Sequence, residues 1–159
     1  KSREETVKWV GPTIVFQTYF YESGKRPMRA SSLADSKSLR IGVVRGNVHD
    51  SFLTESGFSD IHRLTNYDQC FQLLATGRVE LTPSSTIQFE ERVRAARLSI
   101  NDFLRTKVKL FEKSGYIAMS KNIPDRIINH WQQALDEVKQ SGRFDRLFHR
   151  YVKAPNLSE

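Results

Sequence analysis

The stretch 39–80, LRIGVVRGNVHDSFLTESGFSDIHRLTNYDQCFQLLATGRVE, decides the fold of this chain. Its apolar run Leu39–Val44 predicts a strand, which passes through the turn RGN (45–47) into a helix. The first N–H groups of a helix have no intrahelical partners, and the helix dipole is positive at that end. The sequence therefore predicts an anion-binding corner where this strand meets the helix.

On either side of this corner, strands and helices are expected to alternate. Runs of β-branched and aromatic residues predict strands at 13–21, 39–44, 61–64, 79–82, 106–111 and 116–120. Capping residues and helical periodicity predict helices at 31–37, 48–56, 67–75, 84–98, 125–140 and 144–151. Gly77 is expected to end the helix 67–75, because a left-handed glycine commonly follows the last turn. This alternation favours an α/β fold with a largely parallel sheet.

The composition limits the class of protein. At 159 residues, of which 38% are hydrophobic, the chain can form one domain or slightly more. Its net charge of +7 suits anionic partners in general. The basic residues alternate with acidic ones, as in EERVR (90–94) and GRFDR (142–146), which indicates a scattered basic surface. We therefore expect no nucleic-acid partner, and no apolar run is long enough to span a membrane.

The chain offers little for catalysis or metal binding. Its single cysteine, Cys70, excludes an internal disulfide, and its place on the apolar face of a helix predicts a buried, unreactive thiol. The four histidines lack metal-ligand spacing, and His49 beside Asp50 is expected at the surface. Because the motifs of nucleophilic and nucleotide-dependent enzymes are also missing, we expect no catalytic residue, metal or cofactor.

Several segments resemble, in order, those of a known family. They are SREE (2–5) and VKWVGP (7–12), LADSKSLRIGVVRG (33–46), LLATGRVE (73–80), GYIAMSK (115–121), and WQQAL to SGRF with a final tyrosine (131–151). Their order and spacing resemble the C-terminal two-thirds of the bacterial extracytoplasmic solute-binding proteins of family 3. That family, of the amino-acid type, supplies the substrate-binding component of ABC transporters.

The resemblance implies a type II periplasmic-binding-protein fold, with two α/β lobes joined by crossing strands. Residues 1–24 would form a strand segment of lobe 1 and the first hinge, and 25–113 would form a nearly complete lobe 2. Residues 114–152 would return to lobe 1 with its closing helices, and 153–159 would be a polar tail. The opening half of lobe 1 has no counterpart in this chain.

That missing half would otherwise cover apolar side chains of lobe 1. We expect exposed faces on the strand Thr13–Phe20 and on the closing helices, which carry Trp131, Leu135, Phe144, Leu147 and Phe148. Exposed apolar patches of that size favour association, so a homodimer formed through these elements is one expectation.

The resemblance also implies residues that bind the solute. Arg3 would clamp a carboxylate, because a guanidinium pairs with both oxygens at once. The turn Arg45, Gly46, Asn47 and Val48 would offer backbone N–H groups to the same carboxylate. The alternatives are a solvated arginine near a terminus and a plain turn between a strand and a helix.

Ser84 and Ser85 mark a departure from the family pattern. Amino-acid binders commonly place an aspartate at the position of Ser85 to hold the α-ammonium group, and a neutral hydroxyl cannot offset that charge. Either another part of the protein holds the amine, or the ligand is not a standard α-amino acid. The alternative role for both serines is capping of the helix 84–98. Trp9 would lie near the cleft, where it would stack on the solute or pack in the hinge.

Taken with the resemblance, these features predict non-catalytic binding of a small polar solute, amino-acid-like or carboxylate-bearing, between two lobes. The resemblance further implies a periplasmic location, a signal peptide in the natural protein and a membrane permease as partner. The alternative is a divergent sensor or an interaction module that oligomerises through its incomplete lobe.

Overall fold

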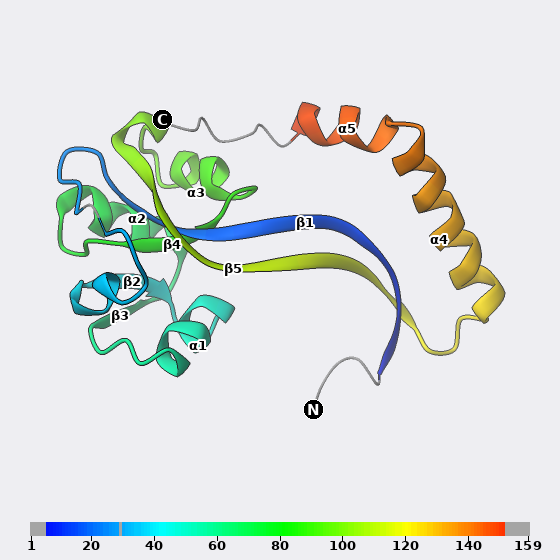
Figure 1. Cartoon of the computed structure of the whole chain (residues 1–159), viewed down its shortest axis with the longest axis horizontal. Helices are drawn as coiled ribbons and strands as arrows, with labels where there is room; N and C mark the ends of the chain where they lie inside the picture. The colour runs from blue at the N-terminus through cyan, green and yellow to red at the C-terminus, as the bar shows by residue number, and fades with distance from the viewer. Residues whose placement is uncertain (1–5, 29, 152–159) are drawn as a thin grey trace. The chain divides into compact units, whose positions relative to one another are not determined.

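A computed structural model describes residues 6–28 and 30–151, which group into two units. The larger unit contains residues 17–28 and 30–111, and the smaller contains 6–16 and 112–151. Two long strands, β1 (Val7–Ser23) and β5 (Phe103–Ser120), contribute residues to both units and are neighbours in one sheet (Figure 1). The lobe boundaries expected at 24/25 and 113/114 stay predictions.

The larger unit alternates short strands with short helices, as the sequence predicts. In chain order its remaining elements are η2 (Asp35–Ser38), β2 (Ile41–Val44), α1 (Val48–Glu55), β3 (Ile61–Leu64), α2 (Tyr67–Thr76), β4 (Thr82–Ser85), α3 (Phe89–Ala95) and η3 (Ile100–Asp102). Gly77 ends α2 in the left-handed conformation, with φ of 75°, which confirms its predicted place.

The strands form two sheets of different character. β2 and β3 pair in parallel, from Ile41 opposite Ile61 to Val44 opposite Leu64, and Ile41 also bridges Leu81 in parallel. The second sheet has the order β4-β1-β5, in which β4 runs antiparallel to β1. The expected parallel pairing therefore holds for β2 and β3 but not for β1 and β4.

Two elements that neighbour β1 in its sheet differ from the sequence prediction. The strand expected at 79–82 lies at 82–85, where Ser85 is opposite Thr18 and Ser84 is opposite Tyr19. Strand pairing thus outweighs the capping tendency of the serines, and α3 begins only after Gln88. The two strands expected at 106–111 and 116–120 are the single strand β5.

Two apolar clusters form the core of the larger unit. One surrounds β2 and includes Phe20, Ile41 and Leu53, each with no exposed surface. The other joins α2 to α3 and includes Phe71, Leu74 and Val93, together with Tyr21. These clusters hold the strands and helices that position the site described below.

The smaller unit contains the outer halves of β1 and β5 with α4 (Asp125–Gln140) and α5 (Arg143–Tyr151). Its helix α4 buries no residue, and Trp131 and Leu147 expose 52% and 47% of their surface. Exposure of these helices was expected and is confirmed for both residues, whereas Phe20 of the expected strand is buried in the larger unit. Within the described residues, no helix combines the length and apolarity needed to cross a membrane.

Candidate functional site

The candidate site lies where the parallel strands of the larger unit end. β2 ends at Val44 and β3 at Leu64, and each leads within a few residues into the next helix. The chain before β4 runs parallel to β2, so the end of β4 at Ser85 faces the same way. In open α/β sheets, ligands bind at this carboxyl edge of the strands. Residues from three strand-to-helix connections meet there.

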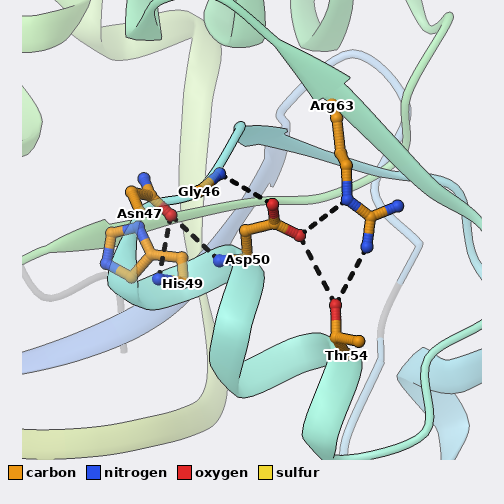
Figure 2. Close-up of polar contacts among 6 residues, drawn as sticks. All are labelled: Gly46, Asn47, His49, Asp50, Thr54 and Arg63. Carbon is orange, nitrogen blue, oxygen red and sulfur yellow. Dashed lines mark hydrogen bonds and ion pairs between the residues drawn. The ribbon is translucent and has the colours of Figure 1, made fainter.

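The first connection is the corner predicted to bind anions (Figure 2). The N–H of Gly46, which has φ of 69°, donates to Asp50 Oδ2 at 2.8 Å. The N–H groups of His49 and Asp50 both donate to Asn47 Oδ1 at 2.9 Å, so Asn47 caps α1. A carboxylate therefore does occupy this corner, but it belongs to Asp50.

Asp50 is balanced by a basic side chain from β3. Its Oδ1 accepts a hydrogen bond from Arg63 Nε at 2.9 Å, and its side chain exposes only 10% of its surface. The other arm of Arg63 donates to Thr54 Oγ1 at 2.9 Å (Figure 2). This ion pair ties α1 to β3 and fixes the shape of the turn at Gly46. Binding of a solute by Arg45, Gly46, Asn47 and Val48 stays a prediction.

The second connection contributes Tyr67, the first residue of α2. Its hydroxyl accepts a hydrogen bond from Asn47 Nδ2 at 2.9 Å and lies 3.4 Å from His49 Nδ1. His49 exposes 4% of its surface and stacks on Phe111 with ring centroids 5.8 Å apart. The expectation of a surface histidine is therefore wrong, because β5 brings an aromatic side chain from far along the chain against α1.

The third connection contributes Arg92 of α3. Its guanidinium carbon lies 3.4 Å from the centroid of the Tyr67 ring, a cation–π contact. Its Nη1 donates to Ser84 Oγ at 3.0 Å, and its Nη2 donates to Gln88 Oε1. Burial lowers the pKa of Arg92, because removal from water disfavours the charged form.

The two serines predicted for this region are buried at the end of β4. Ser84 exposes none of its surface and Ser85 exposes 2%. The hydroxyl of Ser85 donates to Gln88 Oε1 at 3.1 Å, and that oxygen also accepts from Arg92. Neither serine caps a helix, since Gln88 occupies the N-cap of α3, so the capping alternative is wrong.

A cavity of about 350 Å³ opens between α2 and α3 beside this network. Its lining combines the aromatic ring of Tyr67, the guanidinium of Arg92 and the amide of Gln88, with four further residues, Asn66, Asp68, Glu91 and Ala95. An aromatic face and a few convergent polar groups are the usual composition of a small-molecule site.

Two other residues were predicted to bind the solute, Arg3 and Trp9. Arg3 falls outside the described residues. Trp9 lies in the smaller unit, where its ring and that of Tyr116 form a T-shaped pair with centroids 6.2 Å apart. Sequence reasoning missed Tyr67 and Arg92, the two residues that connect Asn47 to Ser84. The signal for Tyr67 was available, because Asn66-Tyr67 follows β3 as Asn47-Val48 follows β2.

Cys70 follows the sequence prediction. It exposes 1% of its surface, and burial raises the pKa of its thiol to about 11. In the part of the chain that the structure describes, no three His, Cys, Asp or Glu side chains gather closely enough to hold a metal ion.

No protein-family model and no curated protein sequence matches this chain. Several solved structures match it. One is an amino acid ABC transporter substrate-binding protein from Streptococcus pneumoniae, bound to L-arginine, which matches with a TM-score of 0.75 at 15% identity. The match covers 95% of this chain and 64% of that one. A histidine kinase sensor domain with similarity to periplasmic binding proteins matches with 0.73 at 15% identity, over 97% and 66%.

A third matching structure is that of an ancestral amino-acid-binding protein, a precursor of cyclohexadienyl dehydratase. It matches with a TM-score of 0.74 at 16% identity, over 95% of this chain and 64% of that one. This chain spans about two thirds of the length of each of the three. At identities this low the likeness concerns the fold alone. The chain thus has the type II periplasmic-binding-protein fold, in the part of that architecture that it spans.

Proposed function

We propose that this chain binds a small polar solute at the carboxyl edge of its larger unit. The observation that carries the proposal is the network from Asn47 through Tyr67 and Arg92 to Ser84, which brings three strand-to-helix connections together. Such a network holds polar groups in fixed positions beside the cavity between α2 and α3. Prepositioned groups bind a solute at a lower entropic cost than mobile ones.

The fold and the ordered sequence motifs together support a relative of the family 3 solute-binding proteins. In that role the solute would lie between two lobes, and contacts from both would favour the closed state. Arg3 and Trp9 would contribute from the facing lobe. The full-length protein would then act in the periplasm as the substrate-binding component of an ABC transporter, with a membrane permease as its partner and no catalytic step or cofactor.

A sensor or interaction module is the second candidate. The likeness to a histidine kinase sensor domain supports a sensor. The apolar side chains exposed on the smaller unit support an interaction module, since Val15, Trp131 and Leu147 each expose between 47% and 53% of their surface. Two copies that cover these side chains would form a homodimer.

Thermal unfolding separates these candidates. The chain would be heated with each of the standard amino acids and a set of small carboxylates, and its mass in solution would be measured in parallel. A solute present at 100 times its Kd stabilises the folded state by about 2.7 kcal/mol, which raises the Tm by roughly 5–10 °C for a domain of this size. A monomer with such a shift supports solute binding. A dimer that responds to no solute supports the interaction module and refutes the first proposal.

A further inference from the structure

Arg92 gives the edge of the larger unit a charge opposite to the one that an amino-acid binder needs there. The guanidinium donates to Ser84 Oγ at 3.0 Å and shares Gln88 Oε1 with the hydroxyl of Ser85. Ser85 is the residue that stands where the resemblance would place an aspartate. A cation is therefore present beside the position where an ammonium group of the solute would be held.

The hydrogen bonds of Arg92 among the described residues go to neutral oxygens, and its flat face rests on the Tyr67 ring. A neighbouring arginine on the same helix differs, since Arg94 forms an ion pair with Glu90 at 2.8 Å. Arg92 is also the more buried of the two, so water screens its charge less. Among the described residues, Arg94 thus forms an ion pair and Arg92 does not, although the neighbouring Glu91 favours the charged form of Arg92 through space.

Two carboxylates also line the cavity. Glu91 is exposed to solvent and Asp68 is partly exposed, so water weakens the field of both. Arg92 is half-buried, as Asp68 is, but its guanidinium donates to the buried hydroxyl of Ser84 at the end of β4. A solute in the cavity would therefore meet the guanidinium on the side where it contacts Ser84.

The geometry points to Arg92 as the residue that receives an anionic group of the solute and selects against solutes with an ammonium group at that point. This inference rests on the proposed function and specifies its solute class. The guanidinium suits the task because two parallel N–H donors match the two oxygens of a carboxylate. Stacking on Tyr67 keeps the guanidinium plane oriented, so little side-chain entropy is lost on binding.

Three probes with one common end test the inference. Succinate, succinamate and β-alanine share a carboxylate on two methylenes, and their other ends are anionic, neutral and cationic. Binding to the full chain would be measured by titration calorimetry and by the shift in Tm. We expect succinate to bind most tightly and β-alanine least. Arg92→Gln should weaken the binding of succinate by about 10- to 100-fold, so that succinate no longer binds more tightly than succinamate.

Two variants serve as controls. Arg94→Gln removes an exposed arginine from the same helix, and this variant should bind the three probes in the same order of affinity as the wild type. Arg92→Lys keeps the charge but loses the paired donors, so it should recover part of the preference for succinate, which a loss of folding would not. The Tm of each free variant checks that it is folded.

The outcomes are distinct. Tightest binding of β-alanine by the wild-type chain, or an unchanged order in folded Arg92→Gln, overturns the inference and leaves solute binding in place. If none of the three probes binds while another solute does, the inference also fails alone. If no solute of any kind binds, the inference fails together with the proposed function.

Discussion

Removal of the Asp50 carboxylate tests how the corner at Gly46 is built. Asp50→Ala would leave the Gly46 N–H and the guanidinium of Arg63 without their shared acceptor. It would also leave empty a position that is bounded by an N–H donor, a cationic side chain and the start of α1. The variant thus converts a corner filled by its own side chain into one open to external anions.

The size of the effect follows from the two contacts that are lost. A hydrogen bond to a charged group contributes about 1.5–3 kcal/mol when it is buried. The Gly46 contact at 2.8 Å is part-buried, whereas Arg63 exposes 38% of its side chain and its contribution is screened. We therefore expect Asp50→Ala to lower the free energy of unfolding by about 2–3 kcal/mol. Asp50→Asn keeps an acceptor for Gly46 and should lose roughly half as much.

Urea unfolding followed by circular dichroism measures these differences. Asp60→Ala is the matched control, because Asp60 lies in the same unit and its exposed carboxylate contacts the exposed ring of His62. Its loss should change stability by no more than about 0.5 kcal/mol. Acetate or formate should restore part of the stability of Asp50→Ala and have no such effect on the wild type. If Asp50→Ala is as stable as the control variant, the corner does not depend on this carboxylate and the reasoning fails.

Three further predictions concern the rest of the chain. Phe71→Ala should cost about 3–5 kcal/mol in urea unfolding because Phe71 has no exposed surface, and a loss below about 1 kcal/mol would contradict the packing of α2. Burial raises the pKa of the Cys70 thiol to about 11, so the folded state keeps the full stability of the neutral thiol below about pH 9 and loses it as the pH rises through 11. Thiol labelling in native buffer at pH 8 should proceed only through unfolding, and rapid labelling would show that the thiol is not buried. Trp131→Glu together with Leu147→Glu should leave the Tm almost unchanged, since both residues are half-exposed, and should abolish any dimer seen by light scattering if the smaller unit is the interface.

The local elements of this fold were predictable where short-range signals decide them. Helix α4 has the predicted bounds, because Pro124 precedes its first turn and Gly142 lies just beyond its end. Gly77 ends α2 as expected for the same kind of reason. The strand β4, predicted at 79–82 and found at 82–85, shows that short-range signals do not decide every element. Its Thr-Pro-Ser-Ser sequence favours a turn or a helix start, but pairing with β1, more than sixty residues earlier, makes it a strand.

The site was less predictable than the fold, since its key contacts join residues that carry no motif. Arg92 looks like one of several arginines on a charged helix, and only the approach of α3 to α2 places it on Tyr67. Yet the sequence did show a difference at the same place, a serine where the family that it resembles commonly has an acid. Had Ser85 been an aspartate, it would stand beside Gln88, the shared acceptor of Ser85 and Arg92, and would compensate the guanidinium internally. On the proposal above, the neutral Ser85 and the half-buried Arg92 form one feature, because no acid at position 85 would compete with a solute for the guanidinium.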